Sequence, residues 1–167
     1  MAAFNEFWYR KAPRARRDEL QTIASFFHPL DLVGSWNRLY GRRGMVQYQF
    51  VVPFGAEDTV RTVVERLSDS GITSFLAVLK RFGEGTPAPL SFPRAGWTLA
   101  LDVPAGSAGL GELLRGLDDL VLDAGGRHYL AKDSCTTRDA IVRGYPRLDE
   151  WLVPNADQAG SIHGFDG

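Results

Sequence analysis

Cysteine is nearly absent from this sequence, since Cys135 is the only one among 167 residues. A single thiol cannot form an internal disulfide or supply a cluster of cysteine ligands for a metal. This usage fits a reducing compartment, so we expect a cytoplasmic protein whose stability comes from an apolar core. The chain can build one such core, because 44% of it is hydrophobic and it includes ten Phe and four Trp.

Long hydrophobic runs are lacking as well. No stretch approaches the roughly 18 apolar residues that a membrane-spanning helix needs, and Met1–Glu6 lack the basic head and apolar stretch of a secretory leader. These absences predict a soluble chain. Residues 10–17 are strongly basic and are interrupted by Pro13. We interpret them as a solvated connector, and the alternative is a peripheral contact with anionic lipid or phosphate at a membrane.

Neither sign of charge dominates the chain. Lys and Arg number 19 and Asp and Glu number 20, which leaves a net charge of −1. Proteins that bind the phosphate backbone of nucleic acids are usually strongly basic, so we expect no nucleic-acid partner. The length predicts one domain at 45–152, preceded by an N-terminal segment at 1–44 that packs on it and followed by a flexible tail at 153–167.

Two kinds of hydrophobic periodicity alternate from residue 45 onward. Tyr48 and Phe50 alternate with glutamines, which is typical of a strand. Val60, Val63 and Val64 recur at spacings of three and four, which is typical of an amphipathic helix. The expected elements are strands at 45–53, 74–82, 96–104 and 127–132 and helices at 56–71 and 108–126.

The order strand-helix-strand, repeated once, predicts a ferredoxin-like α+β fold, in which an antiparallel sheet carries both helices on one face. The first and third strands are central neighbours in that fold. Their outward side chains should therefore share the face away from the helices, together with apolar residues of the second strand. Antiparallel sheets often leave one face wet, but exposed apolar material usually marks a contact, so we expect a functional partner to cover this face. The side chains expected on it include Gln47, Gln49, Lys80, Phe82, Thr98 and Ala100.

Lys132 ends the last expected strand, in the stretch "GGRHYLAKDS". A half-buried ammonium is costly unless a polar group meets it. The lysine therefore either extends to water or faces a site, and the strand position alone does not decide between the two.

Several longer strings carry a resemblance to a known family. The strings "FFHPLDLVGSWNRLYG", "QYQFVVP", "LKRFG", "APLSFPRAGWTLALDVP", "GGRHYLAKDS" and "YPRLDEW" occur in this order. Together they resemble the C-terminal substrate domain of the decaprenylphosphoryl-β-D-ribose 2-oxidase family, in the vanillyl-alcohol-oxidase and sugar-lactone-oxidase group. The similarity runs from about Phe4 to Trp151.

The resemblance implies an FAD-dependent oxidoreductase that removes hydride from a secondary hydroxyl carbon of a sugar, with a polyprenyl-phosphoryl ribose as substrate. Enzymes of this family hold most of the FAD in a larger N-terminal domain, and nothing in this chain resembles that domain. No glycine-rich strand-turn-helix that could cradle a pyrophosphate is present either. The implied partner is therefore a flavin-binding domain or a separate flavin-binding chain.

The family's functional residues can be placed on this sequence. By resemblance, Lys132 lies beside the flavin ring and the reacting sugar as the catalytic residue, and Tyr129 lies near the FAD. The positions that match the substrate pocket are Gln47, Gln49, Lys80, Phe82, Thr98 and Ala100. Many family members have a cysteine at the position of Ala100 and an asparagine at that of Thr98, so the substrate of this chain remains open.

Several other interpretations of the sequence do not involve catalysis. His28 has no neighbouring ligand in the sequence and is best read as a packed or surface histidine, and we expect no metal site. A stand-alone small-molecule sensor and an interaction domain without activity of its own both stay open. An RNA-binding sheet needs exposed aromatics, whereas Gln47 and Gln49 occupy the central positions here.

Overall fold

The computed structural model describes residues 2–12, 20, 22–23, 43–132 and 135–153, and it divides the chain into two compact units, Met1–Arg42 and Arg43–Gly167. In the first unit, helix α1 (Ala2–Lys11) carries an ion pair between Arg10 and Glu6 at 2.7 Å. His28, Trp36, most of the basic stretch and nearly all of the predicted tail lie outside the described residues. The predicted N-terminal segment and tail therefore stay predictions.

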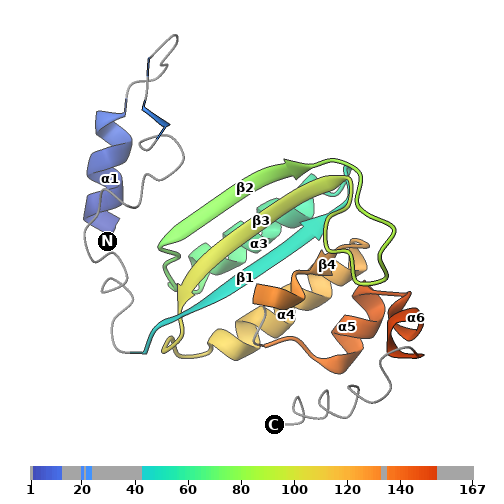
Figure 1. The fold of residues 1–167 in the computed structure, drawn as a ribbon. Helices are drawn as coiled ribbons and strands as arrows, with labels where there is room; N and C mark the ends of the chain where they lie inside the picture. The colour runs from blue at the N-terminus through green and yellow to red at the C-terminus, as the bar shows by residue number, and fades with distance from the viewer. Residues whose placement is uncertain (1, 13–19, 21, 24–42, 133–134, 154–167) are drawn as a thin grey trace. The chain divides into compact units, whose positions relative to one another are not determined.

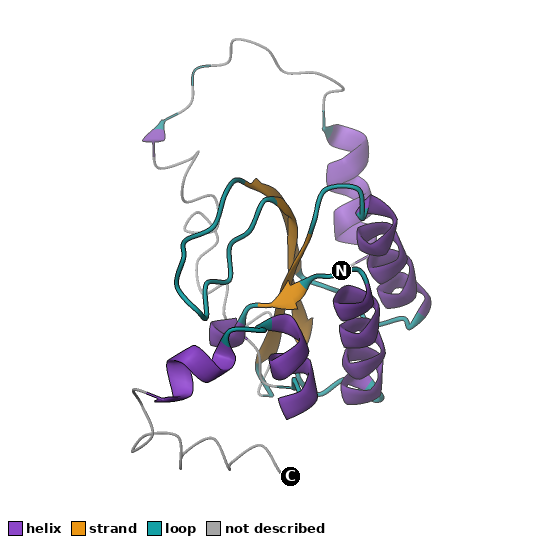
Figure 2. Cartoon of the chain, turned by 90° about the vertical axis from the view of Figure 1, so that its right-hand side faces the viewer, coloured by secondary structure: helices purple, strands orange, loops and turns teal. Residues whose placement is uncertain are grey.

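The second unit is built on a four-stranded antiparallel sheet in the order β2-β3-β1-β4. Helices α3 and α4 lie together against one face of this sheet (Figures 1 and 2). The prediction of an α+β fold is confirmed, as is the pairing of the first and third strands at the centre of the sheet. The elements are β1 (Met45–Val52), α3 (Glu57–Asp69), β2 (Leu76–Phe82), β3 (Gly96–Pro104), α4 (Leu110–Asp123) and β4 (Arg127–His128).

The core lies between the sheet and these two helices. Alternate residues of β1 and β3 enter it from the sheet, and residues three and four apart enter it from α4, so each periodicity in the sequence supplies one wall. Val64 of α3 departs from its expected place on the apolar stripe, because its side chain is 48% exposed. The core is made by Tyr48, Phe50, Val52, Val63, Leu67, Leu99, Leu101, Val103, Leu110, Leu114, Leu117 and Val121.

The two glycines between α4 and β4 have different tasks. Gly125 takes a left-handed conformation with φ of 71°, which ends the helix. Gly126 lies against backbone: a Cβ there would be 2.6 Å from the carbonyl oxygen of Val51 and 2.7 Å from that of Val121. The absence of side chains at both positions lets the chain turn sharply and pass directly into the edge of the sheet.

The last strand is shorter than predicted. β4 pairs with β1 only through Arg127 and His128, and the chain then closes a 3₁₀ turn, η3 (Leu130–Lys132). The backbone N–H of Lys132 donates to the carbonyl oxygen of Tyr129 at 2.9 Å, which turns the chain away from β1. The prediction that Lys132 ends a strand is therefore wrong, because a local turn replaces the ladder after His128.

Two short helices follow that the periodicity did not predict, α5 (Arg138–Gly144) and α6 (Leu148–Leu152). Helices of seven and five residues contain too few turns to produce a clear hydrophobic repeat. The first is capped by Thr137, whose hydroxyl accepts a hydrogen bond from the backbone N–H of Ala140 at 3.2 Å.

Candidate functional site

The face of the sheet opposite α3 and α4 carries the side chains predicted to line a pocket. In the strand register, Gln49 is opposite Ala100, and Ala100 is opposite Val78. Residues directly opposite one another in an antiparallel ladder point to the same side. Thr98 is opposite Lys80, so these two side chains also point to the same side of the sheet. The register therefore confirms that these positions share one face, which we call the open face and define by Gln47, Gln49, Val51, Leu76, Val78, Lys80, Phe82, Thr98, Ala100 and Asp102.

Both glutamines of the open face are held by hydrogen bonds across the sheet. The side-chain amide of Gln47 donates to the carboxylate of Asp102 at 2.9 Å. The amide of Gln49 donates to the hydroxyl of Thr98 at 3.1 Å. Both glutamine side chains are half-buried, whereas Thr98 is only 1% exposed. These hydrogen bonds therefore orient both amides before any ligand binds. The buried Thr98 contributes to the surface by holding the Gln49 side chain in position.

One end of the open face is closed by the chain itself. The connection between β2 and β3 supplies Phe92, whose ring stacks on that of Tyr129 with centroids 4.6 Å apart and meets Phe82 edge-on at 5.8 Å. Phe92 is buried, as are Val51 and Thr98 on the strands. The expectation that no helix of the α3–α4 layer covers this face is met, but a loop covers part of it. Phe82 and Tyr129 thus belong to an aromatic cluster that borders the accessible part.

Lys132 is brought to this side of the sheet by its turn. The backbone N–H of Tyr129 donates to the carbonyl oxygen of Gln49 at 2.8 Å, which attaches the start of the turn to β1. Figure 1 shows η3, in orange, beside β1 and nearer to the viewer than α4. Lys132 is half-buried and Lys80 is exposed. Within residues 43–132 and 135–153, no carboxylate forms an ion pair with either lysine, so their positive charges are available to an oxygen-rich ligand.

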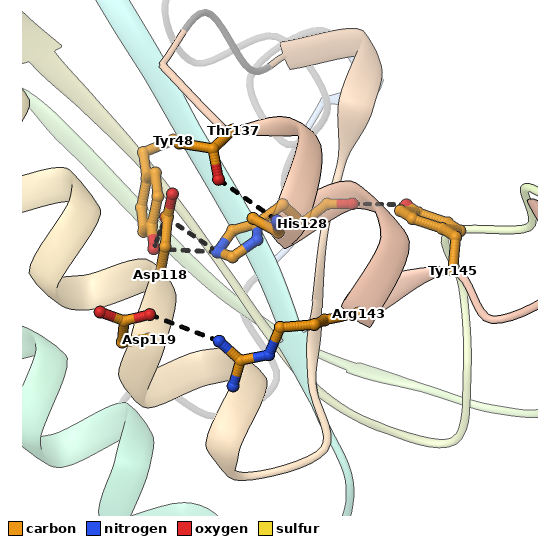
Figure 3. A network of polar contacts seen from close by, with 8 residues as sticks. Tyr48, Asp118, Asp119, His128, Thr137, Arg143 and Tyr145 are labelled. Atoms are coloured by element: carbon orange, nitrogen blue, oxygen red, sulfur yellow. Dashed lines mark hydrogen bonds and ion pairs between the residues drawn. The ribbon is translucent and has the colours of Figure 1, made fainter.

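A buried polar cluster on the other side of the sheet was not predicted (Figure 3). His128 Nε2 lies 3.1 Å from a carboxylate oxygen of Asp118 and 3.1 Å from the hydroxyl of Tyr48, and that hydroxyl donates to Asp118 at 2.9 Å. Because the carboxylate only accepts, the arrangement is satisfied when His128 carries a proton on Nε2. The hydroxyl of Tyr145 donates to the carbonyl oxygen of His128 from α5.

This cluster positions the chain that leads to Lys132. Its members come from β1, α4, β4 and the end of α5, so it ties the last strand to the helix layer just before Tyr129. His128 is opposite Phe50 and faces the core, away from the open face. The sequence held one signal: Asp118 follows Leu114 by four residues and so lies on the apolar stripe of α4, where an acid needs a buried partner.

The remaining candidates add no metal chemistry. Among the described residues, no three His, Cys, Asp or Glu side chains gather as metal ligands would. Cys135, the single cysteine of the sequence, is half-buried. None of the helices formed by the described residues is long and apolar enough to cross a bilayer.

Comparison with known proteins places the chain beside part of an oxidase. No family model matches it. It is 48% identical over 147 residues to the decaprenylphosphoryl-beta-D-ribose oxidase of Mycolicibacterium smegmatis, a match that covers 88% of this chain and 32% of the relative, in its C-terminal part. It is 38% identical over 151 residues to an uncharacterized protein in the mprA 5' region of Streptomyces coelicolor, covering 90% of this chain and 40% of that protein. The chain thus spans well under half the length of either relative.

Proposed function

We propose that this chain, which is homologous to the C-terminal part of decaprenylphosphoryl-β-D-ribose oxidase, is the substrate-binding domain of an FAD-dependent oxidoreductase. The reaction is the oxidation of a secondary hydroxyl of a sugar, with a polyprenyl-phosphoryl ribose oxidised at C2 as the substrate. The observation that carries the proposal is the open face, where two oriented amides and Lys80 lie outside the helix layer. We also regard the sheet as ferredoxin-like, which the strand order β2-β3-β1-β4 supports.

The described residues suit one side of a flavin site. FAD, when bound, supplies the acceptor for the hydride that leaves the hydroxyl-bearing carbon. Tyr129 and Lys132 would hold the cofactor from this chain, since they follow one another around the turn that is attached to β1 beside Gln49. A half-buried ammonium would suit the polar atoms of a flavin ring and a sugar oxygen.

Lys132 acts on the oxygen of the reacting alcohol. The hydroxyl proton passes to a base or water as the hydride leaves the carbon, and an ammonium group held nearby stabilises the negative charge that this proton loss places on the oxygen more in the transition state than in the bound alcohol. Because the cluster of Asp118, His128 and Tyr48 holds the start of the turn, the lysine arrives on an anchored segment. This preorganisation limits the reorganisation needed during the reaction.

The open face orients the sugar. Gln49 and Gln47 present amides that are already held on their strands, so a sugar hydroxyl meets groups with restricted rotation. Lys80 provides an exposed cation for a sugar or phosphate oxygen. Ala100, directly opposite Gln49 in the register, carries only a methyl side chain and leaves room on the face for a ligand.

The partner is a flavin-binding domain or chain that covers the open face. Leu76 and Val78 are half-buried at this surface, and such apolar side chains beside polar ones are typical of a contact region. The chain spans about a third of the oxidase that it matches, which supports a division of the site between this chain and a flavin-binding part.

Reconstitution tests the proposal. The purified chain is titrated with FAD, alone and together with the flavin-binding part of the related oxidase, and flavin absorbance and turnover of a polyprenyl-phosphoryl ribose are measured. We expect no flavin binding by this chain alone, and turnover only in the mixture. Flavin bound by this chain alone contradicts the divided site. A mixture that forms no complex and gives no turnover favours a binding domain without activity of its own.

A further inference from the structure

A separate cleft lies where the connection between β2 and β3 meets the chain around β4 and the end of α5. Its volume is about 380 Å³, and three arginines line it: Arg94, Arg127 and Arg147. Ser91 and Glu84 also contribute to the lining. Three guanidinium groups around one small cleft favour an anion, because each presents several N–H donors in a planar fork.

Two of these arginines are close to each other and lack acidic partners. Burial, followed by the positive charge of Arg94, lowers the pKa of Arg127 below its usual value. In the part of the chain that the structure describes, neither Arg94 nor Arg127 forms an ion pair with a carboxylate. Each bonds instead to a neutral carbonyl oxygen, Arg94 to that of Gly125 and Arg127 to that of Ser91 at 2.8 Å. Among the described residues, no ion pair offsets the repulsion between the two charges.

Arg127 also has a donor that is buried and unused. Its Nε is inaccessible to solvent and has no hydrogen-bond partner. Its guanidinium lies over the ring of Tyr145, 5.4 Å from the centroid, which holds the group in place. An unpaired buried N–H is unfavourable, typically by about 1–3 kcal/mol, and a charged donor by more. Unsatisfied buried donors are rare in native proteins, and a bound ion is one of the explanations for them.

The third arginine is already neutralised. Arg147 forms two hydrogen bonds with Glu150, at 2.6 and 2.7 Å, and a third with the carbonyl oxygen of Pro87 at 2.6 Å. Glu84 places one carboxylate in the lining. The cleft therefore carries two unpaired positive charges and one negative charge, and the arginine pair is the part that attracts an anion.

We propose that Arg94 and Arg127 form a phosphate-binding site, which takes a free phosphate or phosphomonoester or the phosphate of an anionic lipid headgroup. A phosphate dianion supplies the missing counter-charge for both guanidinium groups and enough oxygens to meet several N–H donors. The proposal uses none of the open-face residues and stands independently of the oxidase function.

The arginine Nε–H signals of the ¹⁵N-labelled full chain report on this site directly. Sodium phosphate is titrated at neutral pH against sodium chloride of matched ionic strength. We expect a saturable displacement of the Arg127 signal by phosphate and none by chloride. Because Arg127 also supports Ser91 and Tyr145, the first variant is Arg94→Gln, which should weaken phosphate binding about tenfold or more. Glu84→Gln should strengthen it.

Arg61→Gln on α3 is the matched control, since Arg61 has a largely exposed side chain and does not line the cleft. Sedimentation with phosphatidylcholine vesicles, with and without phosphatidic acid, identifies the source of the phosphate. Co-sedimentation only with phosphatidic acid, lost in Arg94→Gln, assigns a lipid headgroup; saturable phosphate binding without co-sedimentation assigns a soluble phosphate. The proposal is overturned if neither binds, or if Arg61→Gln weakens binding as much as Arg94→Gln.

Discussion

Gln49 and Thr98 are joined by a 3.1 Å hydrogen bond that crosses the two central strands diagonally, since Gln49 is opposite Ala100 in the register. Thr98 is almost completely buried and Gln49 is half-buried, so the bond fixes an amide at the surface from a hydroxyl beneath it. In the proposed oxidase, this relationship orients one of the groups that meet the sugar.

Thr98→Val removes the hydroxyl and nearly preserves its shape. We expect a loss of about 1 kcal/mol in the free energy of unfolding, because the Gln49 amide loses a partner at a partly buried site. Urea denaturation measures this change. Thr62→Val on α3 removes a hydroxyl that donates to the carbonyl oxygen of Asp58 within the same helix, and it serves as the control. Equal losses of unfolding free energy in the two variants would show that the hydrogen bond between Gln49 and Thr98 contributes no more to stability than the hydroxyl of Thr62 does.

Lys132→Ala tests the proposed role of the ammonium. In the reconstituted enzyme, we expect kcat to fall about 10²- to 10³-fold while the flavin stays bound, because one electrostatic stabiliser of the transition state is removed. Flavin absorbance and steady-state turnover separate the two effects. Arg115→Ala on the exposed side of α4 is the control for loss of one positive charge. Turnover that survives Lys132→Ala unchanged contradicts the assignment.

Asp118→Ala and Asp119→Ala compare neighbouring acids with different surroundings. Asp118 is buried with His128 and Tyr48, so its removal leaves two buried polar groups with a missing partner, and we expect a loss of about 3 kcal/mol or more. Asp119 forms an exposed ion pair with Arg143 at 3.4 Å, which contributes less than about 1 kcal/mol. The unfolding curves of the two variants should differ clearly from each other. Similar curves would show that the buried cluster of Asp118, His128 and Tyr48 contributes little to stability.

Glu57 gives the stability a dependence on acid pH. Its own backbone N–H, the indole N–H of Trp97 at 2.9 Å and the N–H of Gly55 lower the pKa of this carboxyl below the ordinary 4.5. The stabilisation is therefore present above the ordinary pKa and is lost as the pH falls through the lower folded-state value.

We expect Glu57→Gln to be less stable than the wild type at neutral pH and the difference to shrink below pH 4.5. Urea midpoints measured across this range test the expectation. Glu65→Gln, an exposed substitution on the same helix, is the control for the charge change. A difference that is constant with pH would show that the carboxylate bonds do not distinguish the folded state.

The side chains that share a face of the sheet could be predicted from the sequence. Period-two alternation placed Gln49 and Lys80 on one side of the sheet, and the spacing of leucines placed α4 on the other. These are local consequences of backbone geometry, because successive residues of a strand alternate and residues three or four apart on a helix coincide.

The way in which the open face is closed, and the polar cluster on the opposite side of the sheet, depend on tertiary packing. The stacking of Phe92 on Tyr129, the turn that ends β4 before Lys132, and the contact of Asp118 with His128 join residues that are distant in the chain or depend on a loop conformation. The presence of Arg94 and Arg127 in the lining of one cleft is of the same kind. Periodicity carries no information about such encounters, because they depend on how irregular segments pack once the regular elements have formed.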